Sequence, residues 1–128
     1  MPWDPLRELV AFRDRASERH AGAWAPPVDV YETPDRFVLV AELPGFTPDD
    51  VSVSATPGSL TLSGRRPPLA VDVQQYLRIE RGQGDFSRTF SFPEAIAVGA
   101  IAADFRDGLL TITVPKADVA APRRIDVR

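Results

Sequence analysis

Few side chains in this sequence are suited to acid–base, nucleophilic or metal chemistry. The chain has no cysteine and a single histidine, His20, which excludes thiol chemistry, disulfides and any multi-histidine metal site. A nucleophilic serine needs a base held within about 3 Å, and His20 lies in an N-terminal segment with little predicted structure. We therefore interpret His20 as a solvated surface residue and expect no metal.

Nucleotide-binding motifs are also missing. Lys116 is the only lysine and has no glycine five residues before it, so the chain has no phosphate-binding P-loop. Gly82 and Gly84 are followed by Ser87 where a dinucleotide fingerprint needs glycine. The carboxylates that acid–base catalysis would need stand at predicted strand boundaries, where turn and surface roles are more common: Asp49, Asp50, Glu80, Asp104 and Asp107. We expect neither an enzyme nor a cofactor.

Length and composition are those of one globular domain with short extensions. The chain has 128 residues, of which 44% are hydrophobic and 26% charged, as in ordinary globular proteins. A net charge of −3 provides no broad cationic face, so we expect neither nucleic acid nor a membrane as a partner. No run approaches the ~20 apolar residues of a membrane span, and the first residues lack the pattern of a secretory signal. The sequence predicts a cytoplasmic protein.

Residues 1–25 are predicted to form an N-terminal arm with a short helix. Asp4 followed by Pro5 favours a helix start, and the next apolar residues recur at helical spacing. The arm is too short to bury its own large apolar side chains, which are Trp3, Leu6, Leu9, Val10, Phe12 and Trp24.

Residues 26–116 change to the two-residue alternation that is typical of β-strands. Run 36–42 is apolar on both faces and is therefore predicted in the middle of a sheet. Because no helix long enough for a parallel crossover lies between the runs, the sequence predicts an all-β, antiparallel, immunoglobulin-like β-sandwich. The predicted strands are 28–32, 36–42, 51–55, 60–64, 86–92, 100–105 and 109–114.

One long connection, between Arg65 and Leu77, interrupts the strands. It contains a strand-like run at 69–73, which Pro67 and Pro68 separate from the preceding strand. A loop this long in a compact sandwich usually has a function. Its apolar run either pairs with the sheet edge of another subunit or forms a surface flap, and the residues fit both.

Residues 117–128 form an alanine-rich C-terminal tail. Ile125 and Val127 project to the same side of an extended segment. Two β-branched side chains on a loose tail suit docking into an exposed sheet edge or groove. A frayed terminus, or a last strand on the chain's own sheet, fits these residues equally well.

Arg88 is the unusual residue within a strand. Alternation puts it on the same face as Phe86, Phe90 and Phe92. Burying a guanidinium alone is costly, so we expect Arg88 to be paired with carboxylates or to reach a subunit boundary. A strand end at which the side chain reaches water is the alternative.

Residues 26–116 resemble the α-crystallin domain of the small heat-shock proteins, particularly the bacterial ones. Residues 3–8 (WDPLRE) are similar to the common start of bacterial members, and 125–127 fit the family's C-terminal I-x-I/V anchor. The motifs that carry the resemblance, in the family's order and spacing, are 27–33 (PVDVYET), 42–46 (ELPGF), 60–66 (LTLSGRR), 80–82 (ERG), 84–90 (GDFSRTF), 92–93 (FP), 107–112 (DGLLTI) and 114–116 (VPK).

The resemblance implies an ATP-independent holdase, which binds partly unfolded client proteins through apolar surface and prevents their aggregation. The six apolar arm residues would contact these clients. The run 69–73 would cross to the sheet of a neighbouring subunit and build a homodimer. The implied dimer-interface residues are Leu69, Val71, Val73 and Arg88.

The resemblance also implies assembly beyond the dimer. The tail anchor, Ile125 and Val127, would dock into a groove of another dimer. The implied groove residues are Val51, Val53, Ile101, Ala103 and Phe105.

A second interpretation is a β-sandwich adaptor that binds one defined partner, like the co-chaperone modules related to this domain. Such modules generally lack both the long loop and the I-x-V tail, which this chain has. The loop is nevertheless shorter than is usual in the family, and Pro67, Pro68 and apolar residues replace its usual charge. An adaptor should be monomeric, whereas a small heat-shock protein should be at least dimeric.

Overall fold

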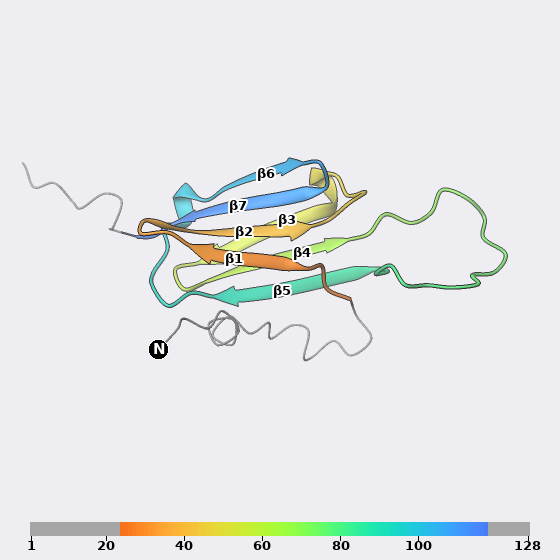
Figure 1. The fold of residues 1–128 in the computed structure, drawn as a ribbon, viewed down its shortest axis with the longest axis horizontal. Helices are drawn as coiled ribbons and strands as arrows, with labels where there is room; N and C mark the ends of the chain where they lie inside the picture. The colour runs from red at the N-terminus through yellow and green to blue at the C-terminus, as the bar shows by residue number, and fades with distance from the viewer. Residues whose placement is uncertain (1–23, 118–128) are drawn as a thin grey trace, which may run out of the picture.

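The computed structural model describes residues 24–117, in which two antiparallel sheets face each other (Figure 1). The four-stranded sheet has the order β1-β2-β7-β6, and the three-stranded sheet has the order β3-β4-β5. Two short 3-10 helices, η1 (Pro48–Asp50) and η2 (Val98–Ala100), precede β3 and β6. The strands are β1 (Val28–Glu32), β2 (Arg36–Glu42), β3 (Val51–Thr56), β4 (Ser59–Arg65), β5 (Asp85–Ser91), β6 (Ala102–Arg106) and β7 (Leu109–Pro115).

Strand β2 lies in the interior of its sheet, as its apolar run predicts. It pairs with β1 on one side and with β7 on the other. Phe37, Leu39 and Ala41 are fully buried, and Val38 is nearly so. Burial on both faces is the reason why this strand does not alternate between apolar and polar residues.

The β6–β7 hairpin turns on two residues with left-handed backbone. Asp107 has φ 54° and Gly108 has φ 77°, the pattern of a tight turn whose twist matches that of the strands it joins. The carbonyl oxygen of Gly108 accepts a hydrogen bond from the backbone N–H of Leu43 at 2.7 Å. This turn sets β6 along the outer edge of the four-stranded sheet.

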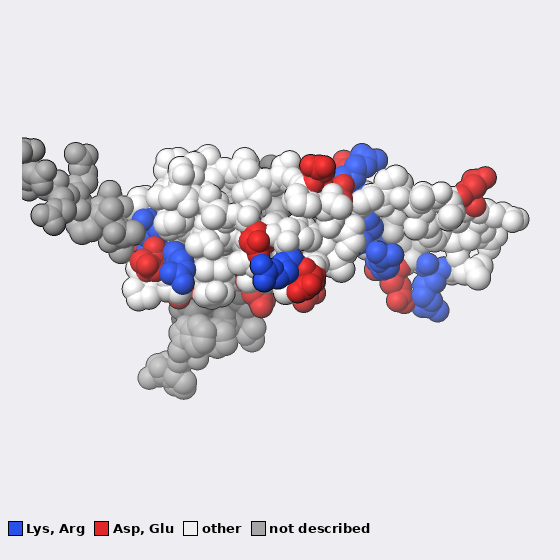
Figure 2. All heavy atoms as spheres, turned by 90° about the horizontal axis from the view of Figure 1, so that it is seen from above, with Lys and Arg blue, Asp and Glu red and all other residues white. Residues whose placement is uncertain are grey.

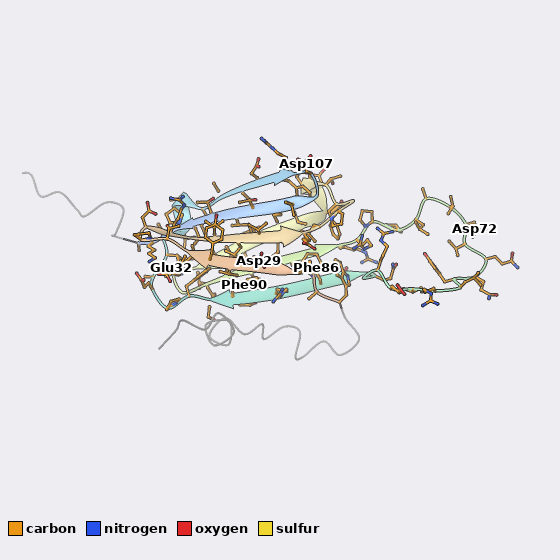
Figure 3. The ribbon with its side chains drawn as sticks, in the orientation of Figure 1. Asp29, Glu32, Asp72, Phe86, Phe90 and Asp107 are labelled. Atoms are coloured by element: carbon orange, nitrogen blue, oxygen red, sulfur yellow. The ribbon has the colours of Figure 1, made fainter. Side chains whose placement is uncertain are left out.

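The core fills the space between the two sheets. Phe86 and Phe90 project into it from β5 (Figure 3) and meet side chains from β2, β4 and β7. Complete burial of each of these large side chains contributes about 1.5–3 kcal/mol. The largest fully buried residues are Phe37, Phe90, Leu39, Leu43, Leu60, Leu62, Ile112, Val114 and Pro26.

The outer face of the three-stranded sheet carries hydroxyl side chains. Nine of the chain's fourteen serines and threonines lie on it, because the opposite residues of each strand face the core. The hydroxyl oxygens of Thr61 and Thr89, on neighbouring strands, are 3.0 Å apart. The strand register aligns these residues in three rows, Ser52-Ser63-Ser87, Ser54-Thr61-Thr89 and Thr56-Ser59-Ser91.

The predicted β-sandwich and its seven strands are confirmed. The largest boundary difference is at the predicted strand 100–105, which begins at Ala102 because the preceding residues form η2. The run 69–73 is not a strand in the single chain. The β4–β5 loop that contains it projects beyond the end of the sandwich (Figure 1), and a strand needs a neighbouring edge to which it can bond. The predicted helix after Asp4 lies outside the described residues.

Candidate functional site

The β4–β5 loop, residues 66–84, exposes a large amount of apolar surface. Val71 is 69% exposed and Leu77 is 91% exposed. Asp72, between Val71 and Val73, marks the far part of the loop in Figure 3. Contiguous exposed apolar surface of this kind marks an interaction site. The exposed apolar residues of the loop are Leu69, Val71, Val73, Tyr76, Leu77 and Ile79.

Four strands have one open edge within residues 24–117. They are β1 and β6 in the larger sheet and β3 and β5 in the smaller one. An open edge presents unpaired N–H and C=O groups that can bond to an added strand. Leu69, Val71 and Val73 were predicted to pair with a neighbouring subunit, and this stays a prediction because the structure holds a single chain.

Arg88 reaches from β5 to the chain that enters β1. Its Nη1 donates a hydrogen bond to the carbonyl oxygen of Pro26 at 2.9 Å. Its guanidinium carbon lies 5.0 Å from the centre of the Phe90 ring, within the range of a cation–π contact. The side chain is partly exposed at this edge of the sandwich. The carbonyl partner could not be predicted, because strand alternation locates side chains and not backbone oxygens of other segments.

A groove of about 290 Å³ separates the edge strands β3 and β6. The predicted groove residues Val53, Ile101 and Ala103 all line it. The other two, Val51 and Phe105, are partly buried and pack against the core. Among residues 24–117, those that line it are Val53, Ser54, Ala55, Val98, Ile101 and Ala103.

Two apolar lining residues were missed by the sequence analysis. Val98 belongs to η2, and a single 3-10 turn leaves no periodic pattern. Ala55 lies on the inward face of β3 beside Val53, and its two-residue spacing could have identified it. Seen from the β6 side, the sandwich has a broad uncharged stretch between its charged groups (Figure 2), so apolar contacts can form here without desolvating ions.

Trp24 contacts both ends of the β4–β5 loop. Its indole Nε1 donates a hydrogen bond to the carbonyl oxygen of Gly84 at 3.2 Å. The guanidinium of Arg66 lies over the same indole, 4.9 Å from the ring centre. Burial of this guanidinium, and to a smaller extent the nearby charge of Arg81, lowers the pKa of Arg66 below its usual range.

Lys116 stands at the point where β7 ends and the tail begins. Its Nζ contacts Glu32 Oε2 at 2.5 Å and Glu94 Oε1 at 3.1 Å, and it lies 5.1 Å from the centre of the Phe37 ring. Only 6% of the side chain is exposed. The hydrogen bond to Glu32 is the largest cause that raises the pKa of Lys116, and Glu94 adds to it. Figure 3 places Glu32 at the end of the sandwich opposite the loop that carries Asp72.

Several predicted site residues lie outside residues 24–117. Trp24 is the one predicted client-binding residue within the described range, and it is partly buried against Phe46 and Phe86. Its aromatic contacts place it with the β-sandwich, although the sequence analysis assigned it to the arm. Those outside the range are the arm residues Trp3, Leu6, Leu9, Val10 and Phe12 and the tail anchor Ile125 and Val127.

Within the described residues, no cluster of three or more histidine, cysteine, aspartate or glutamate side chains could hold a metal ion. The same part of the chain has no helix that is long and apolar enough to cross a membrane. His20 lies outside it. The surface features that the described residues do present are an exposed apolar loop, open strand edges and an apolar groove.

Comparison with known proteins decides the family. The model of the Hsp20/alpha crystallin family matches residues 29–128. The chain belongs to the Hsp20/alpha crystallin family. The resemblance seen in the motifs is thereby confirmed, and the small heat-shock proteins of this family are known as ATP-independent chaperones.

Relatives with similar sequences come from bacteria and plants. The chain is 34% identical over 128 residues to spore protein SP21 of Stigmatella aurantiaca, covering 99% of this chain and 75% of that protein. It is 39% identical over 127 residues to the 16.9 kDa class I heat shock protein 3 of Oryza sativa subsp. japonica, covering 94% of this chain and 83% of that one. The small heat-shock protein domain thus accounts for most of the chain.

Solved structures agree with this assignment. A small heat-shock protein from Xylella fastidiosa, reported to have a distinct high order structure, is 39% identical with a TM-score of 0.66, covering 82% of this chain and 97% of that chain. Heat shock protein 16.0 from Schizosaccharomyces pombe is 35% identical with a TM-score of 0.67, covering 82% of this chain and 99% of that chain. These structural neighbours are consistent with self-association of the Hsp20 domain.

Proposed function

We propose that this protein is an ATP-independent holdase of the cytoplasm, which captures partly unfolded proteins and keeps them from aggregating. The observation that carries the proposal is the apolar surface that the single chain leaves exposed along the loop, at Leu69, Val71, Leu77 and Ile79. A subunit that exchanges partners needs such surface, because the same surface holds neighbouring subunits and can be uncovered.

Dimer formation would use the loop as an added strand. In the proposed dimer, residues 69–73 of one copy bond to the open edge of β1 in the other copy. Pro26, to which Arg88 donates, lies two residues before this strand. The interaction of Arg88 thus holds in place the backbone that would receive the strand.

Larger assemblies would use the tail. Ile125 and Val127 would enter the groove between β3 and β6 of another dimer. Burial of these two side chains gains about 3–6 kcal/mol gross, and ordering the tail takes back roughly 1 kcal/mol or more per residue. Millimolar affinity needs about 4 kcal/mol net, so a single contact should be millimolar or weaker and open readily. Several linked contacts can still hold an assembly together.

Client capture would follow from the same weak contacts. Heat, or an unfolded protein with its own exposed apolar surface, would compete for the grooves and for the arm residues. The driving force is burial of apolar surface, which is not directional, so the range of clients should be broad and no nucleotide is required.

The decisive test is suppression of aggregation without ATP. A disulfide-bonded model client is unfolded with a reductant, and light scattering is followed with and without the protein. Since this chain has no cysteine, the reductant acts on the client alone. We expect a molar excess of the protein to suppress scattering while an equal mass of an inert globular protein does not. Unchanged scattering would contradict the proposal.

The dimer is tested separately by native mass. Val71→Asp places a charge within the apolar run and should shift the protein toward monomer, whereas Gln74→Asp adds the same charge at a polar loop position and should not. A wild-type protein that is monomeric at all concentrations would favour the adaptor interpretation instead.

A further inference from the structure

Trp24 occupies the neck of the β4–β5 loop, which we define as Arg66 on one limb and Gly82 to Gly84 on the other. The indole ring packs edge-to-face on Phe86, with ring centres 5.0 Å apart, and lies 6.0 Å from Phe46. Its Nε1 donates to the Gly84 carbonyl oxygen at 3.2 Å. The ring therefore links the core of the sandwich to the returning limb of the loop.

Arg66 joins the two limbs of the neck around this ring. Its guanidinium carbon lies 4.9 Å from the centre of the Trp24 ring and 5.1 Å from that of Phe46. Its Nε donates to the carbonyl oxygen of Gly82 at 2.5 Å, and its backbone N–H donates to that of Gly84 at 3.1 Å. Trp24 and Arg66 thus share one acceptor, and each stabilises the position of the other.

The glycine at position 82 leaves the space that the ring fills. A Cβ at Gly82 would lie 2.0–2.3 Å from atoms of the Trp24 ring, far inside van der Waals contact, so any other residue here must displace the indole. Gly84, with φ 76°, turns the returning limb so that its carbonyl oxygen meets both donors. The segment 82–84 is therefore shaped around a tryptophan that lies about sixty residues earlier in the chain.

We propose that Trp24 is a positioning residue for the loop: its indole in the neck fixes the two limbs and so sets the direction in which residues 69–73 are presented to a second copy. Displacing the indole from the neck should therefore loosen the loop. The role in the neck stands on the contacts above, whereas its effect on dimerisation rests on the proposed strand exchange. By linkage, a tightly held loop also resists withdrawal of the indole.

The test uses Gly82→Ala as a steric wedge, with Gly58→Ala as its matched control. A Cβ at Gly58 meets nothing within 4 Å and needs no positive φ. Both changes are made in a Trp3→Phe background, so that Trp24 is the only tryptophan left and its fluorescence reports the neck. Hydrogen exchange of residues 66–84 reports the loop, and the concentration dependence of native mass reports the dimer.

We expect Gly82→Ala to shift Trp24 emission to the red and to speed loop exchange about tenfold, the change expected for losing one hydrogen bond and one cation–π contact. Exchange in β2 and β7 should not change. The dimer dissociation constant should rise by about the same factor, and Gly58→Ala should behave as the parent. Trp24→Ala should reproduce the faster loop exchange.

Two outcomes would overturn the inference. One is a red shift with unchanged loop exchange, and the other is unchanged emission in Gly82→Ala. If the parent protein proves monomeric, the proposed exchange dimer fails, but the loop exchange rates still decide whether Trp24 holds the neck. If the parent is dimeric and Gly82→Ala loosens the loop without weakening the dimer, the coupling to dimerisation is wrong.

Discussion

Arg88 and Pro26 connect the two sheets of this small heat-shock protein at one end of the sandwich. The Arg88 Nη1 donates to the Pro26 carbonyl oxygen at 2.9 Å, which ties an edge strand of the smaller sheet to the backbone two residues before β1 begins. Antiparallel sheets that only stack on each other share no backbone hydrogen bonds. This arginine therefore fixes the position of the edge strand β5 relative to the edge strand β1. A neighbouring subunit would contact these two edges.

Replacing this arginine should therefore affect both stability and assembly. Arg88→Ala removes a charged hydrogen bond, for which a loss of about 1.5–3 kcal/mol in the free energy of unfolding is typical. It should also loosen the proposed dimer or yield larger and more heterogeneous particles. Denaturant unfolding and native mass measure the two effects. Arg88→Lys keeps the charge but not the planar fork, so it should recover only part of each. Wild-type behaviour of Arg88→Ala would mean that the side chain only reaches water.

Substitutions in the tail and in the groove should have the same effect on particle size, because the two are proposed to form one contact. Ile125→Ala with Val127→Ala should give smaller particles by light scattering, because both anchoring side chains lose most of their apolar area. Ala103→Asp should have the same effect from the groove side, since it buries a charge under the docked tail. Ala102→Asp is the matched control, because Ala102 is exposed on the same strand and does not line the groove. Equal particle mass in all variants would rule out this contact.

The core prediction concerns the fold and not the assembly. Leu62 is fully buried between the sheets, so Leu62→Ala should lower the free energy of unfolding by about 2–5 kcal/mol. A urea titration of the monomeric form measures it, since subunit association would otherwise add to the apparent stability. Leu77→Ala is the comparison, because this leucine is 91% exposed in the single chain and should leave the unfolding midpoint nearly unchanged. A similar small loss at both positions would contradict the described core.

The contribution of Lys116 to the stability of the fold should depend on pH in the alkaline range. Hydrogen bonding to Glu32 and Glu94 raises the pKa of Lys116 in the folded protein, so folding favours the charged form. Its contribution to stability is fully present below the unfolded pKa of about 10.4 and is lost as pH rises through the higher folded pKa. The stability difference between the wild type and Lys116→Met should therefore be constant from neutral pH to about 9.5 and shrink above about 10.4. A difference that grows with pH would contradict the assignment.

The strands could be predicted because each follows a local rule. Strand β2 is apolar on both faces and lies inside a sheet, and β3 alternates valine with serine because one face meets the core. The turn at Asp107 and Gly108 follows a local rule as well, since a two-residue hairpin needs residues that tolerate left-handed backbone. The family motifs added the groove, of which Val53, Ile101 and Ala103 are lining residues.

The contacts that join distant segments could not be predicted in the same way. The neck brings Trp24 against Gly82 and Gly84, and the acceptor for Arg88 is a backbone oxygen of Pro26. No periodic pattern encodes which side chain fills the space left by a glycine sixty residues away. The strand-like run 69–73 is a different case: its residues favour a strand, but the single chain gives it no edge with which to pair.

Because Lys116 is buried, chemical labelling of its amine can report local unfolding of this end of the sandwich. Lys116 is the only lysine in the sequence, and its amine is held by the carboxylates of Glu32 and Glu94. An acylating reagent at mildly alkaline pH finds no other side-chain amine to modify, so the rate of labelling at this one position measures how often that end of the sandwich comes apart. Mass spectrometry of a single site would then follow local unfolding during heating, in a mixture with any client, without a probe having to be introduced.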